Sequence, residues 1–102
     1  MAGAPNANSY EYVVKGVAVP GTAEQVEANY VLDGNEVNIT ARRANTGSMY
    51  LGFSQTEAQT ASTRKVLIPG QSTGLKIDNT DKIWVDADNA NDRLEISVPK
   101  RP

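Results

Sequence analysis

Several stretches of the chain alternate apolar and polar residues with a period of two. Val37, Ile39 and Ala41, for example, are separated by polar residues. Successive side chains of a β-strand point to opposite faces, so this spacing predicts strands with one buried and one wetted face. The other alternating stretches are 49–54, 83–87 and 94–98, and a run rich in β-branched and aromatic residues occupies 10–19.

Short groups of turn-forming residues separate these runs. They include Pro20-Gly21, Asp33-Gly34-Asn35, Asn45-Thr46-Gly47 and Pro69-Gly70. About six to eight short strands with frequent turns are typical of β-sandwiches and barrels. The pattern therefore predicts an all-β fold, a small antiparallel β-sandwich of the jelly-roll or Ig-like type.

The remaining segments complete the predicted organisation. Residues 1–9 are small and polar and are expected to form a flexible arm, either idle or acting as a strap on a neighbouring subunit. Residues 10–99 form a single sandwich domain, and 100–102 a short tail. Within the domain, 22–32 is expected to be a strand or irregular edge. Residues 55–63 contain no large apolar side chain and are expected to form a long exposed loop.

Composition limits the classes of partner. The 102 residues carry a net charge of −2, without the basic patch that nucleic-acid binding requires. No run approaches the roughly 20 apolar residues that span a bilayer, so no membrane partner is expected. The first residues lack the basic start and apolar run of a signal peptide, so we expect folding in a cytoplasm. A low apolar fraction of 39% suits a protein partly stabilised by a partner subunit.

The chain contains neither histidine nor cysteine. This removes the commonest general base, thiolate metal ligands and every Ser-His or Cys-His nucleophile pair, so we predict a non-enzyme without cofactor. Residues 70–74 (Gly-Gln-Ser-Thr-Gly) match the G-x-S-x-G nucleophile elbow, but that motif needs a strand–turn–helix setting and a histidine. We interpret the segment as a polar bend between strands.

Asp86, Asp88 and Asp92 are close enough in sequence to suggest calcium, which prefers clustered oxygen ligands. The EF-hand pattern fails, because Asn91 replaces the required glycine and Ser97 the closing glutamate. A different calcium site and an ordinary polar turn both remain open, and the turn is the simpler interpretation.

Trp84 is the chain's single tryptophan. If Ile83, Val85 and Ala87 face the core, Trp84 points outward together with Asp86. An outward tryptophan indicates a protein interface or a sugar-stacking platform. A register shifted by one residue would instead bury it in the core.

Four segments of the second half carry an ordered set of features. Residues 44–52 contain an Asn-Thr-Gly turn followed by an aromatic residue, an aliphatic residue and a glycine, and residues 67–72 form a Leu-x-Pro-Gly-x-Ser turn. Residues 77–87 contain the sequence Ile-Trp-Val, and residues 93–98 form a closing strand. Over roughly residues 37–98 the chain resembles a β-sandwich domain frequent among tailed-bacteriophage head proteins, especially capsid decoration (cement) and minor head proteins.

The resemblance implies a virion structural protein, made in the host cytoplasm, that binds the major capsid protein on the outside of an icosahedral head as a homotrimer. The alternatives are a ligand- or carbohydrate-binding module, such as a fibre tip with a platform at Trp84, Tyr50 or Tyr30, and a structural role at the tail or head–tail joint. The predicted partner-interface residues are Ala4, Pro5, Asn6, Tyr10, Tyr12, Tyr50 and Trp84.

Overall fold

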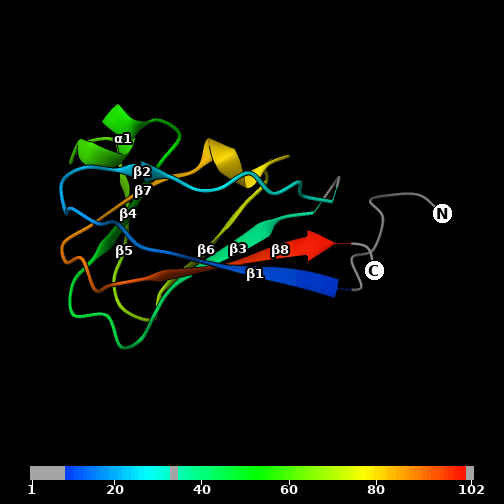
Figure 1. The fold of residues 1–102 in the computed structure, drawn as a ribbon, viewed down its shortest axis with the longest axis horizontal. Coiled ribbons are helices and arrows are strands. Elements are labelled where there is room, and N and C mark those ends of the chain that lie inside the picture. Colours follow the sequence, from blue (N-terminus) through cyan, green and yellow to red (C-terminus); the bar gives the residue numbers. More distant parts are fainter. Residues whose placement is uncertain (1–8, 33–34, 101–102) are drawn as a thin grey trace.

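The computed structural model describes residues 9–32 and 35–100, which form two four-stranded antiparallel sheets (Figure 1). The predicted all-β sandwich is confirmed. The elements are β1 (Ser9–Lys15), β2 (Glu24–Gln25), β3 (Val37–Ala41), β4 (Met49–Gly52), α1 (Gln55–Gln59), β5 (Lys65–Leu67), β6 (Ser72–Leu75), the 3₁₀ turn η1 (Thr80–Lys82), β7 (Trp84–Ala87) and β8 (Leu94–Lys100). Outside the described residues lie the predicted interface residues Ala4, Pro5 and Asn6, the turn residues Asp33 and Gly34, and the tail residues 101–102.

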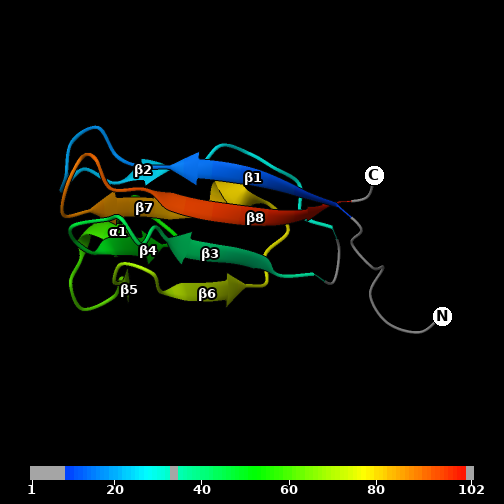
Figure 2. The same ribbon diagram turned by 90° about the horizontal axis from the view of Figure 1, so that it is seen from below.

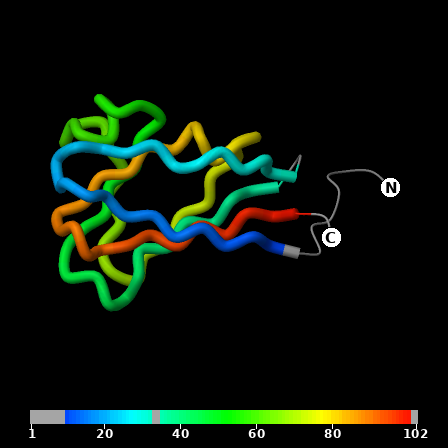
Figure 3. The backbone as a smooth tube through the Cα atoms, viewed as in Figure 1, coloured from blue at the N-terminus to red at the C-terminus, as the bar shows by residue number. Residues whose placement is uncertain are grey.

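The strand order identifies the type of sandwich. One sheet has the order β1-β8-β3-β6 and the other β2-β7-β4-β5. Each successive strand changes sheet except β5, which pairs with β4. This arrangement is the eight-stranded jelly roll, one of the two sandwich types that the sequence left open. Figure 2 shows β1, β8, β3 and β6 side by side, and Figure 3 shows the first and last described segments running together along one edge.

The core lies between the two sheets. In the first sheet Ile39 of β3 pairs with Ile96 of β8, and both side chains are fully buried. In the second, Leu51 of β4 pairs with Val85 of β7 on the inner face. Complete burial of such a side chain contributes about 1.5–3 kcal/mol. The alternation read from the sequence matches the buried face in β3 and β8. In β4 and β7 the outer side is largely buried as well, and Phe53, which the sequence pattern placed on the core side, is 57% exposed.

The first strand is shorter than predicted. It ends at Lys15, and the chain then bends to a tight turn in which the Thr22 N–H donates to the Val19 carbonyl (3.0 Å). Gly21 has φ +92°, a backbone angle that glycine adopts without a side-chain clash. Between 22 and 32 only Glu24 and Gln25 form a strand, which agrees with the predicted irregular edge.

The prediction of a loop over 55–63 is wrong, because the segment begins with α1. The Ser54 hydroxyl accepts a hydrogen bond from the Glu57 N–H (3.1 Å), which caps the helix. Ala58 is fully buried, because the helix packs against β4 and β7. A small residue can therefore anchor a helix where no large apolar one is present. No helix in the described part of the chain has the length and apolar character to cross a membrane.

Candidate functional site

The outer face of β1 presents the most exposed group of apolar side chains in a regular element. Tyr10, Tyr12 and Val14 are 56%, 73% and 50% exposed, respectively. They share one face because they alternate with Glu11, Val13 and Lys15, whose β8 partners belong to the core. We call Tyr10, Tyr12 and Val14 the tyrosine strip. Exposed aromatic side chains on a rigid strand are well suited to bind a partner at low entropic cost.

A shallow depression of about 330 Å³ borders the tyrosine strip on the same sheet. Tyr12 and Val14 form one side of it, and polar residues of β3 and β8 form the rest. The Thr40 hydroxyl lies 2.8 Å from the Ser72 hydroxyl, and Glu95 accepts from Arg42 Nε (3.2 Å). By contrast, no hydrogen bond to a described residue engages the side chains of Asn38 and Ser97, the remaining lining residues. An amide and a hydroxyl are therefore available beside an aromatic ring.

Trp84 points away from the core, which is one of the two placements that the sequence left open. Ile83, Val85 and Ala87 belong to the core, whereas Trp84 lies on the outer face of the second sheet, opposite Gly52. Its side chain is only partly exposed. A Cβ built on Gly52 would lie 2.5 Å from the Ala58 nitrogen, so α1 packs directly over this part of the sheet. Because the helix packs here, only part of the Trp84 side chain is accessible to a partner protein or a sugar.

Tyr50 is buried, although the sequence grouped it with the partner-interface residues. It is 9% exposed, and the Arg64 guanidinium lies 3.6 Å from the centre of its ring. The Tyr50 hydroxyl donates to Asp88 Oδ1 (2.6 Å), and this bond raises the pKa of the phenol and lowers the pKa of the carboxyl. A ring held in this way is not available as a binding platform. Arg64 was not anticipated, because nothing in the local sequence places it over β4.

The three aspartates considered for calcium instead hold the loops together. Asp92 is 2% exposed and accepts from the N–H groups of Thr46 (3.0 Å) and Gly47 (2.8 Å). Asp88 accepts from the Ser48 N–H (2.9 Å), and Asp86 from the Gly21 N–H (2.9 Å). Within residues 9–32 and 35–100, no three acidic, histidine or cysteine side chains are grouped so that they could bind a metal. The structure therefore favours the interpretation of this segment as a polar turn.

Ser72 of the G-x-S-x-G match is the first residue of β6 rather than part of a strand-to-helix elbow. Before it, the Gln71 N–H donates to the Ile68 carbonyl (2.9 Å), and Gly70 has φ +86°. These are the features of a type II turn with proline and glycine at its centre. The bend between β5 and β6 is therefore residues 68–71, whereas Ser72, Thr73 and Gly74 of the match belong to β6, so the predicted polar bend is correct only for the start of the segment.

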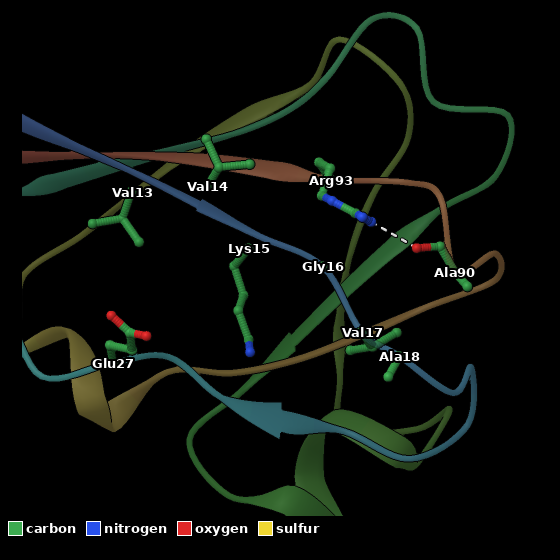
Figure 4. Close-up of a pocket in the computed structure, with 9 residues that line it drawn as sticks. All are labelled: Val13, Val14, Lys15, Gly16, Val17, Ala18, Glu27, Ala90 and Arg93. Atoms are coloured by element: carbon green, nitrogen blue, oxygen red, sulfur yellow. Dashed lines mark hydrogen bonds between the residues drawn. The ribbon is translucent and has the colours of Figure 1, made fainter.

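A second concavity of about 420 Å³ lies at the C-terminal end of β1, where Val13, Val14 and Lys15 line it together with residues 16–18 (Figure 4). Val13 and Lys15 point to one side of the strand and Val14 to the other, while Glu27 faces Lys15 from the neighbouring segment. Arg93 closes the far side, where its guanidinium donates to the Ala90 carbonyl (2.6 Å). No pattern in the sequence indicates this concavity, because its lining residues come from segments far apart in the chain.

The carboxyl groups of Asp88 and Asp92 determine how the free energy of unfolding should change at low pH. Burial raises the pKa of Asp92, but hydrogen bonds from Thr46 and Gly47 outweigh it, so the pKa lies below its ordinary value. Bonds from Tyr50 and Ser48 lower the pKa of Asp88. A carboxyl with a depressed folded-state pKa stabilises the fold above its unfolded pKa, and this contribution is lost as the pH falls through the folded value.

We therefore expect the free energy of unfolding to decrease below about pH 4. Urea denaturation followed by Trp84 fluorescence between pH 7 and pH 2.5 measures it. Asp92→Asn should show a shallower decrease over the same interval. An unfolding midpoint that stays constant down to pH 2.5 would contradict the assignment.

We compared the chain with protein-family models, with curated proteins and with solved structures, and none of the three comparisons found a match. The likeness to phage head proteins therefore remains a prediction from the sequence, and the fold stands on the strand order alone.

Proposed function

We propose that this protein is a virion structural protein that decorates the outside of an icosahedral phage head and binds the major capsid protein through the tyrosine strip. The observation that carries the proposal is the strip itself, three exposed apolar side chains on the outer face of an edge strand. Its action is binding rather than catalysis.

Two further features support the proposal. The jelly roll is a common architecture of viral capsid proteins, although a fold alone does not assign a function. The sequence features that resemble phage head proteins also have definite structural roles. Asn45, Thr46 and Gly47 form the turn clamped to the β7–β8 loop, and Pro69-Gly70 forms the bend before β6.

Binding by a small apolar strip is effective when many copies act on one shell. Each contact can be modest, because neighbouring copies reinforce the same assembly. Within such a contact, one or two aromatic side chains are expected to contribute most of the binding energy. Tyr12 is the best candidate, because it is the most exposed residue of the strip and lies at its centre.

We expect Tyr12→Ala to weaken binding to heads that lack the protein by about tenfold or more. Co-sedimentation of purified protein with such heads, over a range of concentrations, measures the change. Tyr30→Ala is the matched control, since Tyr30 is 61% exposed but lies outside the strip. Equal binding by wild type and Tyr12→Ala would exclude the strip as the contact, and absence of wild-type binding would exclude the proposed function.

A carbohydrate-binding role is the second candidate, and the depression beside Tyr12 favours it. An exposed aromatic ring next to the unengaged side chains of Asn38 and Ser97 provides both stacking and hydrogen bonding for a sugar. Glycan-array binding that is lost in both Tyr12→Ala and Asn38→Ala would establish this role. An array without signal would exclude it.

A further inference from the structure

The free edge of β1 is available for pairing. This seven-residue strand pairs with β8 on one side, and no described strand pairs with the other side (Figure 2). The concavity of about 420 Å³ lies at the C-terminal end of this strand, beside Val13 and Lys15 (Figure 4). An unpaired edge offers a row of backbone N–H and C=O groups to an additional strand.

Two charged side chains determine which strand can bind there. Glu11 and Lys15 both point toward the inner face of the sheet, at opposite ends of the strand. Lys15 contacts Glu24 (2.9 Å), whereas Glu11 has no ion-pair partner within the described residues. Charges at these positions oppose pairing with an arbitrary strand, because they would face apolar side chains. A suitable strand must carry the opposite charges at matching positions.

We propose that β1 binds β1 of a second copy of this chain, in an antiparallel arrangement with Val13 opposite Val13 on a two-fold axis. In this register Glu11 lies opposite Lys15 of the second copy, and symmetry repeats the pair. On the outer face, Tyr12 lies opposite Val14, an aromatic and β-branched pair that favours strand association. A shift by two residues in either direction leaves both charges without an opposite partner, so the charges select one register.

This pairing joins the two outer faces into one continuous sheet surface. The tyrosine strips of both copies then lie side by side, which doubles the apolar surface offered to a partner. The inference does not depend on the proposed function, since its test involves no capsid. A two-fold dimer also differs from the trimer that the sequence resemblance implies, so the two assemblies are distinguished by mass.

Charge-swapped variants test the dimer directly. An edge contact is smaller than a standard interface of about 1,600 Å², so we expect a reversible dimer over about 10–500 µM in analytical ultracentrifugation. Glu11→Lys and Lys15→Glu should each weaken self-association about tenfold, because each places like charges opposite one another twice. Lys15→Glu also removes the ion pair with Glu24 inside the protomer, so Glu11→Lys is the variant that isolates the pair between copies. Mixed together they should form a heterodimer, since every pair is then complementary. Glu36→Lys, the same charge change far from β1, should dimerise like wild type.

A cysteine at the axis tests the register and does not depend on charge. The chain has no cysteine, so Val13→Cys introduces a single thiol. Opposed Cα atoms of an antiparallel pair lie within disulfide range, and we expect oxidation to yield covalent dimers. Val66→Cys on the edge strand β5 is the control and should remain uncrosslinked. A monomer at every concentration, a trimer, or equal crosslinking of both variants would overturn the proposal.

Discussion

Replacing Asp92 by alanine is expected to lower the free energy of unfolding by about 3 kcal/mol. The carboxylate is buried and accepts from the Thr46 and Gly47 N–H groups, which connects the β3–β4 turn to the β7–β8 loop. Without it, two donors lose a charged acceptor in a place that water reaches poorly. Chemical denaturation at neutral pH, fitted to a two-state transition, measures the loss.

Two variants separate the role of this carboxylate from general sensitivity to mutation. Asp92→Asn retains one acceptor oxygen and should lose less stability than Asp92→Ala. Glu95→Ala removes a carboxylate whose pair with Arg42 is solvent-exposed, and it should change stability by less than about 1 kcal/mol. If Asp92→Ala and Glu95→Ala had the same small effect, the loops would not depend on Asp92.

The strands could be predicted because burial on one face leaves a period of two in the sequence. Val37, Ile39 and Ala41 show it clearly, and all three are buried. The strand order could not be predicted, because it depends on which distant strands pair. The sequence places Ser97 and Asn38 on wetted faces, but only the pairing of β3 with β8 sets them opposite each other beside Tyr12.

Helix α1 could not be predicted from hydrophobic periodicity, because residues 55–63 contain no large apolar side chain. The sequence does contain a local signal, since Ser54 is followed three residues later by Glu57, as in a capping box. In the structure the Glu57 carboxylate accepts from the Phe53 N–H (2.9 Å), and the Glu57 N–H donates to the Ser54 hydroxyl. These two hydrogen bonds hold the first turn of the helix. Ala58 then suffices as the buried contact, because Gly52 lets the helix approach closely.

The exposure of the predicted interface residues could be anticipated only in part. Tyr10 and Tyr12 are exposed on β1, whereas Tyr50 is covered by Arg64, a residue that follows α1 in the chain. Whether an aromatic residue on a strand is exposed depends on what crosses its outer face. The helix and the loop after it cover the outer face of the second sheet near Tyr50 and Trp84, and no described element covers the tyrosine strip.

Replacing Gly52 by valine is expected to lower the free energy of unfolding by about 3 kcal/mol, because the added side chain occupies the place of α1. A Cβ at this position would lie 2.5 Å from the backbone nitrogen of Ala58, which cannot turn aside as a side chain can. Because Gly52 lies opposite Trp84, the displaced helix should also change the emission of the chain's single tryptophan in the folded state.

Gly74→Val is the matched control, since Gly74 also lies in a strand. Its nearest contact is the end of the flexible Glu36 side chain, so that variant should retain wild-type stability and emission. Equal stability of the two variants would mean that α1 does not depend on its close approach to β4. A loss of stability without a change in Trp84 emission would place the strain elsewhere in the sheet. Denaturation and native-state fluorescence of both variants therefore distinguish a helix held by Gly52 from one held by its cap alone.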